Sequence, residues 1–310
     1  MRNAFIKTLE LEASKNKNII LLTGDLGFTV FEKFRERFPN RFFNMGVAEA
    51  NMMGVAAGLA LCGKIPFVYS IVPFVTMRPF EQIRNDVCLH KANVKIVGVG
   101  GGFAYSHAGT THHAIEDIAI MRALPNMTVI CPADPLETEL ATRAIIKFKG
   151  PVYLRLGKRG EPKIHKTEPK FSIGKGIIIK KGKDIALVAC GPITQNCLLA
   201  AKELERKGIA ATVVSMHTVK PLDIQLLDKI VRNHKALFVV EEHNIIGGLG
   251  SAVAEYLAEN QKSRIFFKRI GVNDQYCFDI GNHEYIRDIF NLSPNKISQT
   301  IQKYLKKYGI

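Results

Sequence analysis

The chain has 310 residues, of which 47% are hydrophobic and 23% are charged, and its formal net charge is +15. This balance excludes a disordered chain, and the length allows two domains with separate cores. The lysines are spread along the sequence, and neither dense run, residues 180–183 or residues 303–307, has the basic and aromatic pattern of a nucleic-acid site. We therefore expect a solvated basic surface that attracts phosphorylated small molecules and binds no nucleic acid.

The N-terminal residues 1–12 have the spacing of an amphipathic helix and not that of a secretory signal. The longest apolar stretches, residues 54–63 and 65–77, are too short or too interrupted by proline to span a bilayer. Six cysteines lie mostly in apolar runs and form no CxxC pair, which predicts reduced core residues. Together these features predict a cytoplasmic protein without a membrane-spanning segment.

The first half of the chain alternates short apolar runs with stretches of helical periodicity. Uninterrupted apolar runs are typical of parallel strands buried on both faces, and their alternation with helices predicts a doubly wound α/β sheet. The predicted strands are Ile19–Thr23, Ile65–Tyr69, Val94–Val99, Thr128–Cys131 and Val152–Leu156. The predicted helices are Val47–Leu61, Pro79–Lys91, Glu116–Ala123 and Leu136–Phe148.

A polar stretch rich in lysine and proline, residues 158–170, interrupts this pattern and is the best linker candidate. We predict a first domain of residues 1–160, a linker of residues 161–172 and a smaller α/β domain of residues 173–310. The predicted elements of the second domain are strands Ile185–Cys190, Ala211–Ser215 and Ala236–Val240, helices Asn196–Lys207 and Asp223–Asn233, and a helix that opens at Gly247 and runs through Leu257.

Glu49 is the most informative residue, because it is an ionisable side chain in the apolar, Gly- and Ala-rich segment 45–61. The spacing of the small residues suits a helix packed tightly against a neighbour. Burial of an unpaired carboxylate is costly, so we expect this group to be protonated, paired or both. A carboxyl group with a raised pKa could exchange a proton with a heterocyclic nitrogen. The alternative is a glutamate at a helix start that faces solvent or an arginine.

Four segments each end a predicted strand, which is where ligands collect in open α/β sheets: residues 23–29, the Glu49 region, residues 74–80 and residues 107–117. The Gly-rich segments 98–102 and 247–251 lack the spacing and context of a dinucleotide site. His107, His112 and His113 lie close together, but no Asp, Glu or Cys pattern accompanies them, so we predict no metal site in this chain.

The order and spacing of several short motifs resemble the transketolase family, specifically its pyrimidine-binding and C-terminal domains. The resemblance covers nearly the whole chain and is specific only in combination. The matching pieces are residues 44–49 (NMGVAE), 109–112 (GTTH), 124–128 (LPNMT), 132–134 (PAD) and 154–159 (LRLGKR), and in the second half residues 220–223 (KPLD) and 240–251 (VEEHNIIGGLGS), which resemble the related deoxyxylulose-phosphate synthase.

The resemblance implies a cofactor role for Glu49. In that family the equivalent glutamate hydrogen-bonds the aminopyrimidine of thiamine diphosphate and promotes deprotonation of its thiazolium ring. By the same resemblance, Phe74, Met77 and Phe80 line the pyrimidine, and Asp25 lies at the cofactor. Without it, Phe74, Met77 and Phe80 would be interpreted as core residues at helical spacing.

The resemblance also implies substrate contacts. His112 matches a histidine that reaches the substrate near the reacting carbon, where it could orient an oxygen or move a proton. His107 and His113 are expected beside it. Arg2, Thr29 and Arg159 align with positions that hold the distal phosphate of a sugar. Taken singly, these residues could equally be structural histidines, surface arginines or a helix cap.

Two departures from the family pattern bear on substrate choice. His107 and Ala108 replace an acidic pair, one member of which normally reads the hydroxyl beside the donor carbonyl, and Gly100 replaces a phosphate-binding histidine. Our hypothesis is that two-carbon transfer is retained while the donor or the acceptor differs from pentose phosphates.

A third departure concerns the diphosphate and Mg²⁺. The family binds them through a separate domain with a Gly-Asp-Gly…Asn motif, and residues 23–27 (TGDLG) are not that motif. The resemblance therefore implies the C-terminal subunit of a split transketolase, which transfers a two-carbon ketol unit from a ketose, expected to be phosphorylated, to an aldose. Its partner would be an N-terminal transketolase-like subunit that binds most of the thiamine diphosphate and Mg²⁺, in an α2β2 assembly. Alternatives are the beta subunit of a 2-oxoacid dehydrogenase and a non-catalytic subunit of the same fold.

Overall fold

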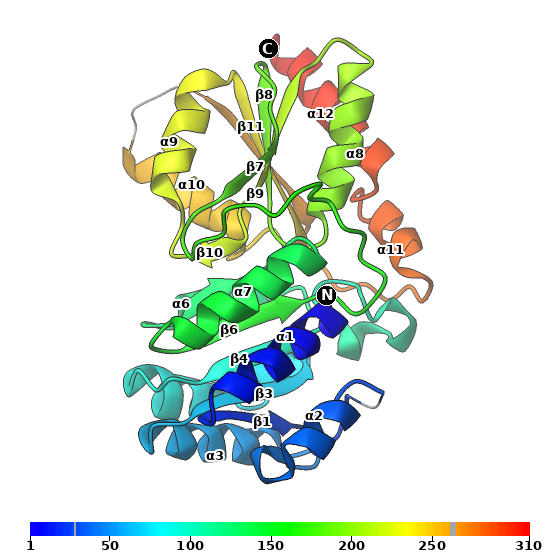
Figure 1. The fold of residues 1–310 in the computed structure, drawn as a ribbon. Helices are drawn as coiled ribbons and strands as arrows, with labels where there is room; N and C mark the ends of the chain where they lie inside the picture. The colour runs from blue at the N-terminus through cyan, green and yellow to red at the C-terminus, as the bar shows by residue number, and fades with distance from the viewer. Residues whose placement is uncertain (28, 261–264) are drawn as a thin grey trace.

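A computed structural model describes residues 1–27, 29–260 and 265–310, which form two α/β units stacked on one another (Figure 1). Within the described residues, the larger sheet has seven strands in the order β10-β5-β6-β4-β3-β1-β2. All its pairings are parallel except that of β10 with β5. Its strands are β1 (Ile19–Thr23), β2 (Phe42–Asn44), β3 (Ile65–Ile71), β4 (Lys95–Val99), β5 (Thr128–Ile130), β6 (Val152–Leu156) and β10 (Thr218–Lys220).

Helices cover both faces of this sheet, as a doubly wound fold requires. On one face, α1 (Arg2–Lys15) and α7 (Pro135–Lys147) bury Phe5, Leu9 and Ile145 against the strands. On the other face, α3 (Glu49–Leu61), α6 (Asp117–Ala123) and the π-helical η2 (Ile83–Leu89) join a second core. The remaining short helices are α2 (Glu32–Arg37), η1 (Pro39–Arg41), α4 (Val72–Thr76), α5 (Phe80–Gln82), η3 (Ser106–Ala108) and η4 (Thr110–His112).

The smaller sheet has five strands within the described residues, in the order β12-β11-β8-β9-β7, and only β7 pairs in an antiparallel direction. Its strands are β7 (Ile177–Lys180), β8 (Ile185–Ala189), β9 (Ala211–Ser215), β11 (Ala236–Asn244) and β12 (Phe266–Val272). Figure 1 shows α8 (Thr194–Glu205) and α12 (Pro294–Tyr308) on one face, and α9 (Ile224–Asn233) and α10 (Leu249–Asn260) on the other, with α11 (His283–Ile289) beside the first unit.

The two units share a core and a sheet. Leu227, Ile230 and Val253 of the second unit belong to the same buried cluster as Met52 and Val87 of the first. The strand β10, although it lies late in the sequence, extends the first sheet at the edge of β5. The fold is therefore a mixed α/β architecture, as predicted, but the two units are not separate bodies. The boundaries at residues 160 and 173 stay a prediction.

The connecting segment between β6 and β7 is held against the first unit. The backbone amides of Ile164 and His165 donate to Asp134 Oδ2 at 2.9 and 3.3 Å, and His165 Nε2 lies 2.7 Å from Glu137 Oε1. Further along, Phe171 stacks on His217 with ring centroids 4.0 Å apart. The predicted linker is thus fixed by specific contacts.

Two sequence-based expectations differ from the structure. The predicted helix Pro79–Lys91 is divided into α5 and the π-helical η2. The tight packing expected around the small residues of α3 holds for Ala57, which is buried. It is not found at Gly54 or Gly58, where an added Cβ would meet no atom of the described residues within 4 Å. That face of α3 is open, whereas the opposite face buries Met52, Met53 and Ala56. None of the helices formed by the described residues has the length and apolarity needed to cross a bilayer.

Candidate functional site

Glu49 begins α3 and lies beneath the surface at the carboxyl ends of β1 and β3. The residue is 2% exposed. Ser70 Oγ donates to Glu49 Oε1 at 3.0 Å, and Arg78 Nη1 donates to Oε2 at 2.9 Å. Gly24 provides the space, because a Cβ there would lie 3.2 Å from Oε1. The carboxylate is therefore buried, as the functional interpretation required, and it has the arginine partner of the alternative interpretation.

Arg78 connects Glu49 to the aromatic side of the site. Its guanidinium carbon lies 4.0 Å from the centroid of the Phe74 ring, and its side chain is 46% exposed. Phe74 in turn makes an edge-on contact with His112, with ring centroids 5.2 Å apart. Glu49, Phe74 and His112, predicted from separate segments, are thus brought together by contacts. Arg78 was not predicted as a site residue, although it lies inside the candidate segment 74–80.

The other residues predicted at the cofactor lie around this group. Met77 is 39% exposed and follows α4, whereas Phe80 is half-buried and packs on the core beneath. Asp25 ends the first strand in a left-handed conformation, with φ of 55°. Its amide donates to Asn44 Oδ1 at 3.0 Å, and Asn44 Nδ2 donates to Asp25 Oδ1 at 2.9 Å. These two hydrogen bonds join the residue that follows Gly24 to the end of β2, which leads to Glu49.

A cationic group lies on the other side of His112. Lys158 Nζ is 3.2 Å from His107 Nε2 and 4.3 Å from the centroid of the Tyr105 ring, whose centroid is 6.3 Å from that of His112. Burial, together with the positive charges of Arg159 and Arg2, lowers the pKa of Lys158. An anionic substrate group would relieve this repulsion. Lys158 was not predicted as a site residue, although the neighbouring Arg159 was.

The remaining predicted residues are less closely joined to the site. His113 is 5% exposed and packs edge-on against Phe103, with ring centroids 5.1 Å apart, and neither ring nitrogen has a hydrogen-bond partner among the described residues. Burial lowers its pKa, which favours a neutral, structural ring. The amide of Thr29 donates to Glu32 Oε1 at 2.6 Å at the start of α2. No hydrogen bond or ion pair among the described residues joins Thr29 to Arg2 or Arg159.

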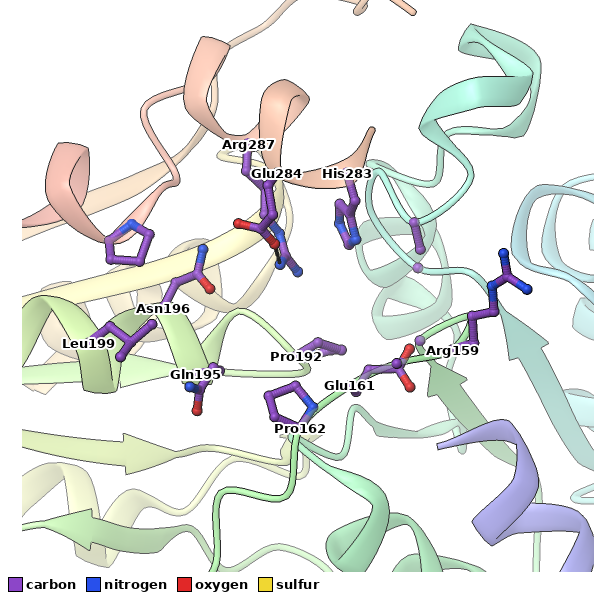
Figure 2. A pocket seen from close by; sticks show the side chains of 15 residues that line it. Arg159, Glu161, Pro162, Pro192, Gln195, Asn196, Leu199, His283, Glu284 and Arg287 are labelled. Carbon is purple, nitrogen blue, oxygen red and sulfur yellow. Dashed lines mark hydrogen bonds and ion pairs between the residues drawn. The ribbon is translucent and has the colours of Figure 1, made fainter. Parts of the chain in front are cut away.

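Two cavities meet at Arg159. One, of about 390 Å³, opens on the site and is bordered by His107, Lys158 and Arg159. The other, of about 360 Å³, lies between the two units. Figure 2 shows Arg159 and Glu161 on one side of it, and the α11 residues His283, Glu284 and Arg287 on another. Glu161 accepts a hydrogen bond from the N-terminal amine at 2.9 Å.

Glu242, at the end of β11, ties α11 to the loop that precedes the histidines. Its carboxylate accepts from the Phe103 amide at 2.6 Å, lies 2.6 Å from His283 Nε2 and pairs with Arg287 at 2.7 Å. Burial alone would raise the pKa of Glu242, but Arg287 and His283 hold it well below its ordinary value. The second unit thereby positions the loop that carries the site histidines.

Among residues 1–27, 29–260 and 265–310, no three or more His, Cys, Asp or Glu side chains are arranged so as to hold a metal ion.

The chain is an α/β protein with two mostly parallel sheets, and the first sheet carries a buried glutamate at the carboxyl ends of its strands. Residues 1–162 match the family model described as the transketolase pyrimidine binding domain, and residues 174–297 match that of the transketolase C-terminal domain. The chain therefore belongs to the transketolase family.

Relatives extend this assignment along the whole chain. A transketolase C-terminal section from Methanocaldococcus jannaschii is 42% identical over 99% of this chain and 96% of its own length. A 6-deoxy-6-sulfo-D-fructose transketolase subunit from a Clostridium species is 38% identical over 96% of this chain and 92% of its own length. A solved split-gene transketolase, described as an inactive β4 tetramer, is 42% identical and superposes with a TM-score of 0.87, covering 98% of this chain and 97% of its own. These matches place the chain among split transketolase C-terminal sections.

Proposed function

We propose that this chain is the C-terminal subunit of a thiamine-diphosphate-dependent transketolase that transfers a two-carbon ketol unit from an anionic ketose to an aldose. The observation that carries the proposal is the buried carboxylate of Glu49, held by Ser70 and Arg78 beside Phe74. Relatives of the same length that are named as transketolase sections or subunits support it. They also favour a transketolase over the 2-oxoacid dehydrogenase alternative.

The residues fit the pyrimidine end of thiamine diphosphate. An aminopyrimidine needs a carboxyl partner for a ring nitrogen and apolar contacts for its faces. Glu49 is joined through Arg78 to the Phe74 ring, and the exposed Met77 precedes Arg78 in the chain. When bound, this cofactor supplies the carbon nucleophile that ketose chemistry requires. The diphosphate and Mg²⁺ would be bound mainly by a partner subunit, with thiamine diphosphate held between the two chains.

The roles of the chain's own groups follow from their chemistry. Glu49 holds a proton at the pyrimidine nitrogen, and Ser70 fixes the orientation of its carboxylate. Arg78 donates a hydrogen bond to the other oxygen of the same carboxylate and places a positive charge beside it. His112, held edge-on by Phe74, is placed to orient a substrate oxygen or to move a proton there.

The substrate would carry an anionic group at the end away from its carbonyl. Arg2, Lys158 and Arg159 lie near one another, and burial together with the positive charges of Arg159 and Arg2 lowers the pKa of Lys158. Phosphate and sulfonate both satisfy such a cluster. His107 and Ala108, which replace the family's acidic pair, would make the donor preference differ from that for pentose phosphates. The sulfosugar named for one relative is compatible with this hypothesis.

The partner subunit would cover the open face of α3. Gly54 and Gly58 have no neighbour within 4 Å of an added Cβ, and Leu61 on the same helix is 66% exposed. Val47, two residues before the helix, is 69% exposed. An apolar helix face of this kind is typical of a surface that is buried in an assembly. An α2β2 enzyme, inactive as separated chains, accounts for it.

Calorimetric titration with thiamine diphosphate and Mg²⁺ tests the proposal, for this chain alone and for a co-expressed complex with the organism's diphosphate-binding subunit. We expect binding only in the complex. Glu49→Gln should lower kcat of the complex by at least about 100-fold, because the amide cannot exchange a proton. The control is Glu81→Gln, an exposed position on α5. Tight binding to the chain alone would contradict the shared site, and no binding in either sample would favour a non-catalytic subunit.

A further inference from the structure

The segment between β12 and α11, residues 273–282, exposes three large apolar side chains at every second position from 276 to 280. Tyr276 is 63% exposed, Phe278 82% and Ile280 68%. Cys277, between the first two, is 1% exposed and points inward. We call this segment the aromatic loop. Exposure of so much apolar surface over five residues is unfavourable in water and marks an interaction site.

The aromatic loop is held in place from several directions. The Cys277 carbonyl accepts a hydrogen bond from Thr110 Oγ1 at 2.6 Å. Asn282 caps α11, because its Oδ1 accepts from the Tyr285 amide at 2.9 Å. The exposed rings are therefore presented on a fixed backbone, which reduces the entropy lost when a partner binds.

Charge around the aromatic loop is opposite in sign to that of the whole chain. Residues 273–289 contain four acidic residues, and their two basic residues are already engaged: Arg287 by Glu242 and Glu284, and His283 by Glu242. Asp274, Asp279 and Asp288 are exposed. A chain with a net charge of +15 thus carries a local acidic and aromatic surface. Its complement is an apolar groove with a rim of lysine or arginine.

The position of the loop also selects its occupant. Thr110, which bonds to Cys277, lies two residues from His112, and Gly281 and Asn282 border the same cavity as His107 and Lys158. Whatever binds the aromatic loop therefore also borders the opening of the candidate site. Glu49 is joined to His112 through Arg78 and Phe74, so a subunit that brings a diphosphate to Glu49 would approach this part of the first unit. A second copy of this chain would bring no diphosphate.

We infer that the aromatic loop docks into an apolar, basic-rimmed groove on the diphosphate-binding subunit of the proposed enzyme. The inference rests on the proposed function and adds to it the surface by which the second unit contacts the partner. Docking would also hold Thr110, and with it the short helix that ends at His112. The loop then couples assembly to the placement of a substrate-contacting histidine.

The test compares the double variant Phe278→Ser/Ile280→Ser with a matched control, Ile178→Ser/Ile224→Ser, whose side chains are 43% and 49% exposed elsewhere on the second unit. The dissociation constant for the diphosphate-binding subunit is measured by sedimentation velocity. We expect the loop variant to bind at least about tenfold more weakly, and the control to change by less than about twofold. Asp274→Lys/Asp279→Lys should weaken binding at low salt, with a smaller effect at high salt.

The outcomes separate the inference from the proposed function. If the wild-type complex forms and both double variants bind equally well, the inference is wrong and the proposed function stands. If the loop variant loses only self-association of this chain, the loop is a contact between copies and the inference is also wrong. If the wild-type chain binds no diphosphate-binding subunit, the proposed function itself fails. Unchanged thermal unfolding of the variants shows that they remain folded.

Discussion

At the scale of single residues, Arg78 links the two chemical parts of the site. Its guanidinium donates to the buried carboxylate of Glu49 and stacks on Phe74, which contacts His112. An arginine suits both contacts, because its planar group can form a directional hydrogen bond while one face lies on an aromatic ring. A lysine at this position could neutralise the carboxylate but could not reproduce the stacked geometry.

The importance of Arg78 can be measured without any cofactor. Arg78→Leu removes the charged partner of a carboxylate whose side chain is 1% exposed. Because Arg78 is itself half-exposed, we expect the free energy of unfolding to fall by about 1–3 kcal/mol, less than for a fully buried pair. Urea unfolding at neutral pH checks this. Arg84→Leu, at an exposed position nearby, is the control, and an equal loss in both variants would show that the Glu49 pair contributes nothing specific.

At the scale of elements, α3 separates two tasks on opposite faces. Its inner face packs Met52, Met53 and Ala56 into the core, and its N-terminus holds Glu49 below the surface. On its outer face, a Cβ added at Gly54 or Gly58 would meet no atom of the described residues within 4 Å. These two glycines therefore do not serve packing within the chain, which leaves them available to let another helix approach closely.

Substitution of the outer glycines distinguishes these two tasks. Gly58→Leu should leave the chain folded, and even raise its melting temperature slightly, because glycine inside a helix costs roughly 0.5–1 kcal/mol relative to better helix formers. The same change should prevent or weaken assembly with the diphosphate-binding subunit by steric overlap. Thermal unfolding of the chain and sedimentation of the mixture are the measurements. Lys202→Leu, exposed on α8, is the control, and unimpaired assembly of Gly58→Leu would remove α3 from the interface.

The elements that sequence analysis predicted well are those with an uninterrupted apolar run, such as Ile19–Thr23 and Val152–Leu156, which are strands with the predicted bounds. It missed β10, which has only three residues and pairs with a strand almost ninety residues earlier. It also missed β12, whose apolar run is broken by Lys268 and Arg269. Such strands are determined by tertiary pairing and not by local pattern.

The same limit applies to the site. Glu49 could be found from sequence because a carboxylate in an apolar, glycine-rich segment is unusual. Arg78, in contrast, acquires its role only when the turn between α4 and α5 brings it to a residue 29 positions earlier. His113 looks equivalent to His112 in the sequence, yet its ring is turned into the core against Phe103. The direction in which each of two adjacent side chains points, and the residue that it contacts, are therefore set by the fold and not by the local sequence.

At the scale of the whole molecule, Glu242 joins the two units electrostatically. It is buried, belongs to the second sheet and binds the Phe103 amide of the first unit as well as Arg287 and His283. Because the fold holds its pKa below the ordinary value of 4.5, this carboxylate stabilises the native state above about pH 4.5. The contribution is lost as pH falls below that value toward the folded pKa.

Glu242→Gln should therefore lower the free energy of unfolding at pH 7 by about 3 kcal/mol, because it leaves Arg287 buried beside a neutral partner. The difference from the wild type should shrink as pH decreases below about 4.5. Denaturant titrations at pH 7 and pH 4 provide the comparison. Glu284→Gln is the control, since that side chain is 65% exposed and its pair with Arg287 should contribute less than about 1 kcal/mol. A gap that widens at acidic pH would contradict this account.

The edge strand β10 has a consequence for how this protein can be divided or recombined. Residues 218–220 complete the sheet of the first unit, and Lys220 Nζ donates to the carbonyls of Arg122 and Leu124 at 2.9 and 2.6 Å. A fragment that stops in the connecting segment would leave the β5 edge bare and part of the shared core in water, and such edges invite aggregation. A chimaera that exchanges the second unit for that of a relative must therefore import a compatible β10 as well. A gene fission or fusion that leaves both units intact must therefore place its break outside residues 1–310, because the two units share a sheet and a core.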